Sequence, residues 1–420
     1  MIMRFCTLLF AAAWFCLFAV SAQTLALTNG RVITAGDGGG TLETATIVIE
    51  DGRITAVGVD VDIPDEAQIV DLTGKVVTPG LIVASTTLGA VEINDRANAN
   101  DIDAASASLS AGADVQYAIN PNSTLIPVAR SGGVSRAVVT PGLDAATEGA
   151  VAFGGQAALI STANQGGAIS QPHVAVTLNL LGSGQGRAAV FPQLKAMLED
   201  ASGFAEDPSP ERASAYKAAK WTPADLQALV PVMRAEIPLY VAVDRASDII
   251  SLLDIADPYD LRIVLVGAAE GWSVADKIAA AGASVVLDPY ENLPQNFDAV
   301  LASPQNIVRL HAAGVPIMIV APRAGHDARL LRFRAGVATA GGLPAETALA
   351  AITSVPARML GLDAYGEIAP GKIADIAVWS GDPFEPLSDL VALYIDGELQ
   401  PLKDRQTALG DKYRSKAEGN

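Results

Sequence analysis

Short runs of alternating hydrophobic and polar residues stand at both ends of the chain. Near the start, apolar runs flank Asp51 and Gly52, a pair that favours the positive φ angles of a tight hairpin turn. Near the end, the runs at 374–379 and 391–395 are followed by Asp396 and Gly397, which form the same kind of pair. A different pattern fills the middle of the chain. We therefore expect antiparallel strands at each end that pair into one composite β-sandwich.

The middle of the chain alternates short apolar runs with amphipathic segments. The apolar runs lie at residues 239–243, 262–266, 284–287 and 316–320. Continuous apolar runs of this length are typical of buried parallel strands. Thr222 followed by Pro223 predicts a helix start, and Ser247 and Ser273 are expected to cap the next two helices. Repeated strand–helix units predict a parallel sheet, either open or closed into a barrel.

The first 22 residues are typical of an export signal. Arg4 precedes an apolar run at 8–20, and the small residues at 20–22 suit a cleavage site. A membrane anchor is the alternative, but the run is short for a bilayer span. We expect an exported protein, periplasmic or secreted, with no membrane span once the signal is removed. Cleavage would also remove Cys6 and Cys16, which are the two cysteines of the chain.

The net charge of −18 argues against nucleic-acid partners, because a phosphate backbone would repel an acidic protein. It says nothing about a small-molecule substrate.

Three motifs carry a resemblance to a known family. They are Val-Thr-Pro-Gly-Leu-Ile at 77–82, Thr-Ser-Val-Pro-Ala-Arg-Met-Leu-Gly-Leu at 353–362, and Gly-Glu-Ile-Ala-Pro-Gly-Lys-Ile-Ala-Asp at 366–375. In this pattern the chain resembles the amidohydrolase superfamily, and within it the imidazolonepropionase-like, exported amidohydrolases. The resemblance implies an α/β fold, a TIM-type (β/α)8 barrel with a composite β-sandwich formed by the N- and C-terminal segments. The implied divisions are a signal peptide at 1–22, the sandwich at 23–78 and 362–403, the barrel at 79–361, and a tail at 404–420.

The resemblance also implies a reaction, the hydrolysis of non-peptide C–N bonds in amides or cyclic amides. Such enzymes hold zinc or another divalent metal at the barrel mouth, where it lowers the pKa of a bound water. Ser85 and Thr87 stand where the family has His-x-His, and Asp244 ends a strand that should carry histidines. Gly267 stands in a further histidine position, and Pro322 stands where the family has an aspartate. The metal ligands are therefore substituted, and we expect no metal and no cofactor.

A count of histidines leads to the same expectation. The chain contains only His173, His311 and His326, and none of them forms a His-x-His or His-x3-His motif. We expect His173 to be structural and His311 to lie on a helix. Glu270 is expected to cap the helix near Ser273.

A few polar residues remain as candidates at the barrel mouth. Asp244, His326 and Asp327 are weak catalytic candidates, since a carboxylate or imidazole there can act as an acid or base. Arg323 can hold an anionic ligand beside the substituted positions Ser85, Thr87, Gly267 and Pro322. A salt-bridged loop that also involves Arg329 is the structural alternative.

Three functions stay open. The first is a degenerate, non-catalytic homologue that partners a metal-competent relative in a hetero-oligomer, or forms a homo-oligomer. The second is an active hydrolase with metal-independent or weak-metal chemistry. The third is a periplasmic module that binds a small molecule at the vacated mouth.

Overall fold

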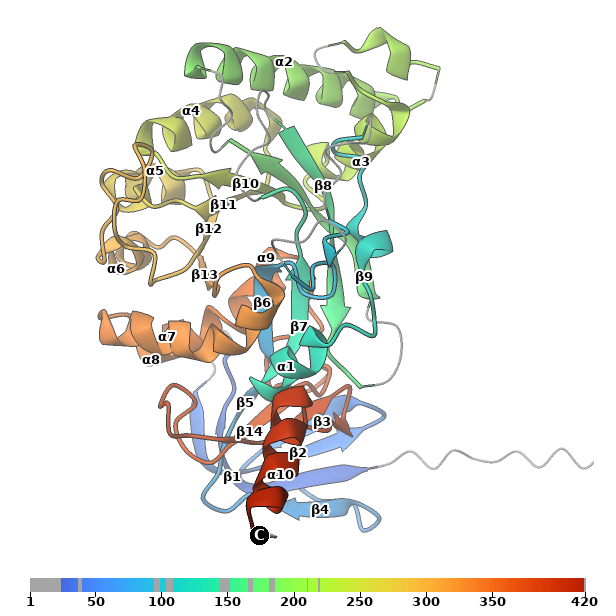
Figure 1. The fold of residues 1–420 in the computed structure, drawn as a ribbon, viewed down its shortest axis with the longest axis vertical. Helices are drawn as coiled ribbons and strands as arrows, with labels where there is room; N and C mark the ends of the chain where they lie inside the picture. The colour runs from blue at the N-terminus through green and yellow to red at the C-terminus, as the bar shows by residue number, and fades with distance from the viewer. Residues whose placement is uncertain are drawn as a thin grey trace, which may run out of the picture.

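The structure is a computed structural model. It describes residues 24–36, 40–93, 99–102, 109–143, 152–164, 169–180, 186–209, 211–217 and 220–418. The predicted signal peptide and both cysteines lie outside these ranges. Within them the chain forms an α/β fold built on two sheets, as Figure 1 shows. No helix in the described ranges is both long and apolar enough to cross a bilayer.

The first sheet, called here the terminal sheet, draws its strands from both ends of the chain. They are β1 (Leu25–Ile33), β2 (Thr41–Glu50), β3 (Arg53–Gly58), β4 (Gln68–Asp71), β5 (Val76–Pro79), β14 (Ile376–Trp379), β15 (Leu390–Ile395) and β16 (Glu398–Leu399). The order is β16-β15-β14-β5-β1-β2-β3, and β4 pairs with β1. Antiparallel pairing of Val77 with Val378 joins the two ends. The expected pairing of N- and C-terminal strands is confirmed.

Both predicted hairpin turns form and then meet each other. Asp51 and Gly52 have φ angles of 49° and 76°, and Asp396 and Gly397 have 53° and 78°. A Cβ on Gly52 would lie 2.6 Å from the carbonyl oxygen of Asp396. Glycine is therefore required at 52 both by the sign of φ and by the approach of the second turn.

The second sheet, called here the barrel sheet, has eight strands. They are β6 (Leu81–Thr86), β7 (Val134–Val139), β8 (Ala152–Ser161), β9 (Ile169–Asn179), β10 (Leu239–Val243), β11 (Ile263–Gly267), β12 (Ser284–Leu287) and β13 (Ile317–Ile319). Their spatial order is the reverse of the sequence order, from β13 to β6. The sheet curls until residues 351–352 connect its two edges: Ile82 N donates to Ile352 O and Ile319 N donates to Ala351 O. A nearly closed TIM-like barrel results, as the resemblance to the amidohydrolases implies.

One strand departs from the regular alternation. β8 is antiparallel to both of its neighbours, β7 and β9. Only the seven residues 162–168 separate the end of β8 from the start of β9. A link this short permits a hairpin but not the crossover of a dozen or more residues that parallel strands need.

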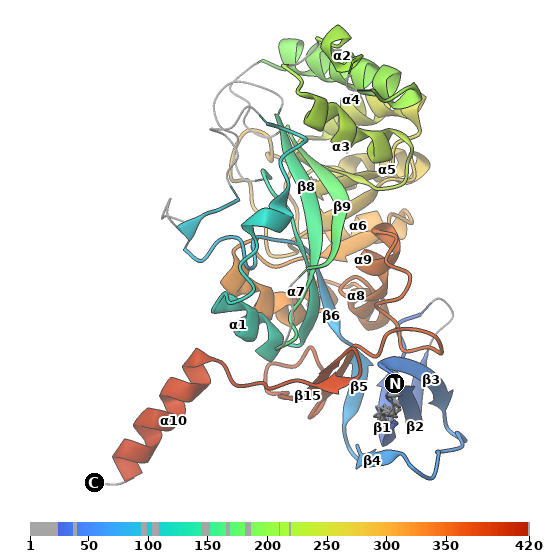
Figure 2. The same ribbon diagram turned by 90° about the vertical axis from the view of Figure 1, so that its right-hand side faces the viewer.

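Most of the helices lie along the outer side of the barrel sheet (Figure 1). They are α1 (Leu125–Ser131), α2 (Arg187–Glu206), α3 (Pro223–Met233), α4 (Ala246–Ala256), α5 (Ala275–Ala280), α6 (Asn306–Ala312), α7 (Leu331–Ala340), α8 (Ala345–Ala350) and α9 (Ser354–Met359). Short 3-10 helices are η2 (Val115–Ala118), η3 (Ala213–Ala215), η4 (Asp257–Tyr259), η5 (Gly271–Val274) and η6 (Gly325–Leu330). The C-terminal helix α10 (Arg405–Glu418) projects away from the body of the molecule, as Figure 2 shows.

The predicted helix starts are confirmed in one case and wrong in two. Thr222 caps α3 in a full capping box with Asp225. The residue before the first turn of α4 is Arg245, so Ser247 lies inside that helix. Ser273 lies within η5, and α5 begins two residues later. Ser247 and Ser273 are therefore not caps.

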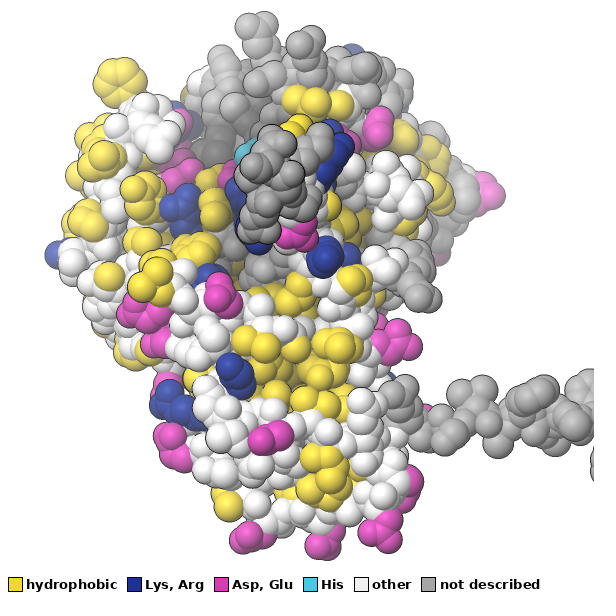
Figure 3. Space-filling view, turned by 60° about the horizontal axis from the view of Figure 1, so that its bottom comes forward, with side chains coloured by type: hydrophobic (Ala, Val, Ile, Leu, Met, Phe, Trp, Pro, Cys, Tyr) yellow, Lys and Arg dark blue, Asp and Glu magenta, His cyan; other side chains and the backbone are white. Residues whose placement is uncertain are grey.

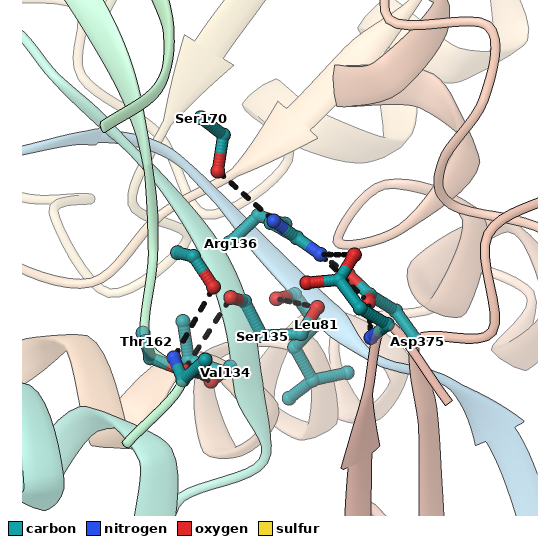
Figure 4. A network of polar contacts seen from close by, with 10 residues as sticks. Leu81, Val134, Ser135, Arg136, Thr162, Ser170 and Asp375 are labelled. Atoms are coloured by element: carbon teal, nitrogen blue, oxygen red, sulfur yellow. Dashed lines mark hydrogen bonds and ion pairs between the residues drawn. The ribbon is translucent and has the colours of Figure 1, made fainter. Parts of the chain in front are cut away.

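A buried ion cluster joins the two sheets. Arg136 on β7 donates from Nε to Asp375 Oδ2 at 2.7 Å and from Nη2 to Asp375 Oδ1 at 3.0 Å (Figure 4). Arg136 Nη2 also donates to Asp396 Oδ1 at 2.6 Å, and Nη1 donates to Ser170. The side chains of Arg136 and Asp375 are 3% and 4% exposed. Asp375 closes the third sequence motif, so that motif fixes the barrel against the terminal sheet.

The terminal sheet also carries a cavity of about 960 Å³. Leu25, Ile49, Val70 and Tyr394 line it, and Asp396 and Glu398 are among its polar residues. Figure 3 shows hydrophobic side chains gathered on the surface of the part of the molecule that the terminal sheet forms. None of its lining residues lies at a mouth end of a barrel strand.

Candidate functional site

The carboxyl ends of the parallel barrel strands meet at one edge of the sheet, which is where barrel enzymes bind their ligands. At this mouth stand Ser85 and Thr87 at the end of β6, Asp244 after β10, Gly267 at the end of β11, and 320–323 after β13. The positions predicted from the sequence therefore belong to this edge. The site itself stays a prediction, but its geometry can be described.

The hydroxyl groups at the end of β6 are hydrogen-bonded to other parts of the protein. Ser85 is fully buried, and its Oγ lies 2.7 Å from Thr140 Oγ1. Thr87 is 5% exposed; its Oγ1 and its N–H both donate to the carbonyl oxygen of Arg323, at 3.1 and 2.8 Å. Thr86 Oγ1 donates to the same oxygen. The Ser85 hydroxyl thus links β6 to the end of β7. The hydroxyls of Thr86 and Thr87 link β6 to the segment that follows β13.

Arg323 completes this connection with its side chain. Its Nη2 donates to the carbonyl oxygen of Thr140 and lies 3.3 Å from Thr140 Oγ1. The guanidinium thus points toward the carboxyl end of β7. The backbone and the side chain of Arg323 therefore both stabilise the mouth, and part of its hydrogen-bonding capacity is already used within the protein.

The side chain of Asp244, after β10, lies directly against Gly267 at the end of β11. Gly267 has a φ of +91°, and a Cβ added to it would lie 2.5 Å from Asp244 Oδ1. Asp244 Oδ1 in turn accepts from the N–H of Ala269 at 3.2 Å. A histidine at 267 would require both a different backbone conformation and a displaced carboxylate. Both the positive φ and the position of the Asp244 carboxylate therefore favour glycine at 267.

The carboxyl of Asp244 is the most perturbed group at the mouth, together with Asp288. Burial raises the pKa of Asp244 to about 6, the N–H of Ala269 opposes this, and the charges of Asp298 and Glu270 raise it further. A carboxyl with this pKa exchanges its proton near neutral pH, which is the property a general acid or base needs.

Asp288 is a mouth residue that the sequence analysis missed. It follows β12 directly, and its Oδ2 lies 3.3 Å from Arg334 Nε on α7. Burial raises the pKa of Asp288 to about 6, against the opposing effects of the Tyr290 N–H and of Arg334. The sequence signal that indicated Asp244, an acidic residue directly after a buried strand, is also present at Asp288. No sequence signal points to Arg334.

The other candidates contribute less to the mouth. Pro322 lies three residues beyond the end of β13 and is half-buried. His326 is 56% exposed, and its Nε2 lies 3.5 Å from Asp327 Oδ2. Arg329 donates instead to Gln406 near the C-terminus, so the expected salt-bridged loop does not include it.

Three further predictions can be compared with the structure. Glu270 accepts from Ala246 N and Leu301 N, so it supports the start of α4 and not a helix at Ser273. His311 lies on α6, as expected.

His173 lies on β9, six residues before the strand reaches the mouth at Asn179. At about 3.3 Å per residue that separation is roughly 20 Å, so His173 stands far from Asp244.

The donor chemistry of the mouth does not fit the metal that the family implies. Among the substituted positions, Ser85, Thr87, Gly267 and Pro322 offer two hydroxyls, a hydrogen and a pyrrolidine ring. Asp244 adds one carboxylate, whereas zinc in this family would need several imidazole nitrogens as well. Across the described residues, no group of three His, Cys, Asp or Glu side chains is arranged to hold a metal ion.

Comparison with known sequences gives relatives of one kind. A sequence model of the amidohydrolase family matches residues 261–402. The amidohydrolase tasK of Hapsidospora irregularis is 23% identical over 393 residues, covering 84% of this chain and 39% of that protein. An imidazolonepropionase of Vibrio cholerae is 40% identical over 75 residues, 17% of this chain and 18% of that enzyme. This chain therefore matches about two fifths of the length of the first relative and less than a fifth of the second.

Solved structures share the fold at low sequence identity. An amidohydrolase from Thermotoga maritima MSB8 superposes with a TM-score of 0.77 at 23% identity, covering 89% of this chain and 99% of its own. Molinate hydrolase superposes with a TM-score of 0.55 at 17% identity, covering 91% and 95%. Together with the nearly closed barrel, these matches show that the chain has the fold of the amidohydrolases and that its residues 261–402 match the amidohydrolase family model.

Proposed function

We propose that this chain is an exported, non-catalytic member of the superfamily, in which the barrel mouth has lost the metal-dependent hydrolysis of C–N bonds. One observation carries the proposal. Four of the positions that would supply metal ligands, those of Ser85, Thr87, Gly267 and Pro322, hold poor ligands, and the hydroxyls of Ser85 and Thr87 are already hydrogen-bonded within the protein. Water has a pKa near 16, and without a metal to lower it to about 7, hydroxide is scarce at neutral pH.

The hydrogen bonds at the mouth also support the proposal. Arg323 uses its backbone oxygen for Thr86 and Thr87 and its side chain for Thr140. Restoring a histidine at 267 would also require Asp244 to move. Several changes at separate strands would therefore be needed together before a metal site could form.

A turnover assay tests the proposal. The whole chain, incubated with dipeptides and cyclic amides, should release no product, and added Zn²⁺ should not change this. Zinc-dependent turnover would contradict the proposal.

A retained fold without catalysis suits a partner role, and we propose a metal-competent relative as that partner. Such a pair should survive purification at equal stoichiometry when the two chains are co-expressed. Elution of this chain alone, as a monomer or a homo-oligomer, would count against the pairing.

A second candidate, an active hydrolase that needs no metal, is favoured by one observation, the raised pKa of Asp244. Asp288 shares this property. We expect two carboxyl groups to titrate near pH 6 in ¹³C NMR spectra of aspartate-labelled protein. Asp244→Asn should remove one of them and Asp288→Asn the other. Midpoints near 4 for both groups would contradict the burial argument.

The same titration has a consequence for stability. A carboxyl whose pKa is higher in the folded than in the unfolded chain binds its proton more tightly when folded. The contribution of protonated Asp244 to the free energy of unfolding is therefore full below about pH 4 and is lost as the pH rises through about 6.

If Asp244 acts as a general base, turnover of an amide should rise through the same pH interval and vanish in Asp244→Asn.

A further inference from the structure

The C-terminal helix α10 stands in solvent. Every residue from 405 to 414 is exposed, and Figure 2 shows the helix projecting from the body of the molecule. A helix of 14 residues is marginal in water without packing, and Gly410 in its interior weakens it further. A helix with these properties needs a surface to pack against.

The base of α10 is fixed to α1 by hydrogen bonds. Asp404 caps α10 by accepting from Thr407 N and from Thr407 Oγ1, at 2.7 Å each, and it also accepts from Ser131 Oγ. Just before it, the carbonyl oxygen of Pro401 accepts from Nε of the buried Arg130. These bonds set the direction in which α10 leaves the body, which is away from the terminal sheet of its own chain (Figure 2).

One face of α10 combines apolar and basic side chains. Leu409 and Tyr413 are four residues apart, so they lie one above the other, and they are 42% and 63% exposed. Arg405 precedes Leu409 by four residues on the same face, and Lys412 follows Leu409 by three. Such a face is suited to a groove with an apolar wall and an acidic rim.

The cavity of about 960 Å³ on the terminal sheet is a groove of this kind. Part of its wall is apolar and accessible, since Val391 and Leu399 are 47% and 63% exposed. Exposed apolar surface of this kind marks sites of interaction. The charged residues that line the cavity are three exposed carboxylates and one guanidinium, those of Asp51, Asp396, Glu398 and Arg53.

We propose that α10 of one copy docks in the terminal-sheet cavity of a second copy, and that the two copies exchange helices around a twofold axis. Leu409 and Tyr413 would face the apolar wall, and the basic side chains beside them would face the carboxylates. Strand β16 lines the cavity, and α10 begins at Arg405, six residues after Leu399. The base of the helix therefore lies close to the cavity on each copy, as a reciprocal twofold contact requires.

The exchange goes beyond the proposed function and does not involve the barrel mouth. None of the substituted positions lines the cavity or lies on α10. A relative that pairs with this chain would then be found in an assembly that contains two copies of this chain. Failure of the exchange would leave the proposal for the mouth unchanged, and zinc-dependent turnover would leave the exchange unchanged.

Sedimentation velocity of the whole chain tests the exchange. The parent chain should form a dimer, and its dissociation constant should rise as NaCl is added, because salt screens the exposed charges. Leu409→Glu on the helix and Val391→Glu in the cavity should each raise the dissociation constant by at least about tenfold. Leu387→Glu is the matched control, since Leu387 is 95% exposed but lies on neither surface, and this chain should dimerise like the parent.

Mixing the two variants distinguishes the exchange from other contacts. The Val391→Glu chain keeps an intact helix and the Leu409→Glu chain keeps an intact cavity, so the mixture should form a heterodimer through one contact at a concentration where each variant alone is monomeric. Pairing of α10 with α10 predicts instead that Val391→Glu dimerises by itself, and docking of α10 in the cavity of its own chain predicts a monomeric parent. Either result would overturn the proposal, and so would a dimer that Leu409→Glu leaves unchanged.

Discussion

Replacing Arg136 by alanine should lower the free energy of unfolding by about 3–5 kcal/mol, the typical cost of breaking a buried ion pair by removing one partner. The substitution leaves Asp375 buried at 4% exposure without its cation, and it also removes a contact to Asp396. Burial alone disfavours the charged guanidinium, but the two carboxylates outweigh burial and raise the pKa of Arg136. Denaturant unfolding followed by circular dichroism measures the loss.

Arg31 provides the matched control for Arg136. It also pairs with a carboxylate, Glu43, at 3.3 Å, but the two side chains are 47% and 76% exposed. Arg31→Ala should therefore cost less than about 1 kcal/mol. Equal losses for Arg31→Ala and Arg136→Ala would show that the buried cluster does not hold the two sheets together.

Gly267→Ala should lower the free energy of unfolding by about 2–4 kcal/mol, combining the strain of a positive φ with overpacking against a neighbour. The φ of +91° disfavours any Cβ, and Asp244 Oδ1 would lie 2.5 Å from the new atom. The measurement is again denaturant unfolding, with attention to any change in slope.

Two variants divide this cost into its parts. Gly74 has a φ of +73°, and a Cβ added to it would meet no atom within 4 Å, so Gly74→Ala measures backbone strain alone. In the double variant Asp244→Ala with Gly267→Ala, the clash is relieved, and the two changes should couple by at least about 1 kcal/mol. Additive effects would mean that Asp244 does not exclude a side chain at 267.

The architecture follows from the sequence wherever local pattern and tertiary pairing agree. The hairpin turns at Asp51 and Asp396 depend on residues that favour positive φ, and both form. Continuous apolar runs predicted β10 to β13 to within about a residue at most boundaries. The direction of β8 was not predicted, because strand direction depends on the length of the links on each side and not on the apolar pattern.

The site was predictable in position but not in its connections. The end of a buried strand is a sufficient signal for Asp244, and the same signal was available for Asp288. That Thr87 would bond to the backbone of Arg323 depends on contacts across 236 residues of sequence. Likewise, nothing local to Glu270 indicates that it accepts from Ala246 and Leu301. Such pairings arise only when the barrel closes.

The most direct test of the proposal that the mouth binds no metal is the zinc content of the whole chain after incubation with excess Zn²⁺ and dialysis. The substituted ligand positions predict that no stoichiometric zinc is retained. One or two retained equivalents, lost again on Asp244→Asn or Asp288→Asn, would contradict the account.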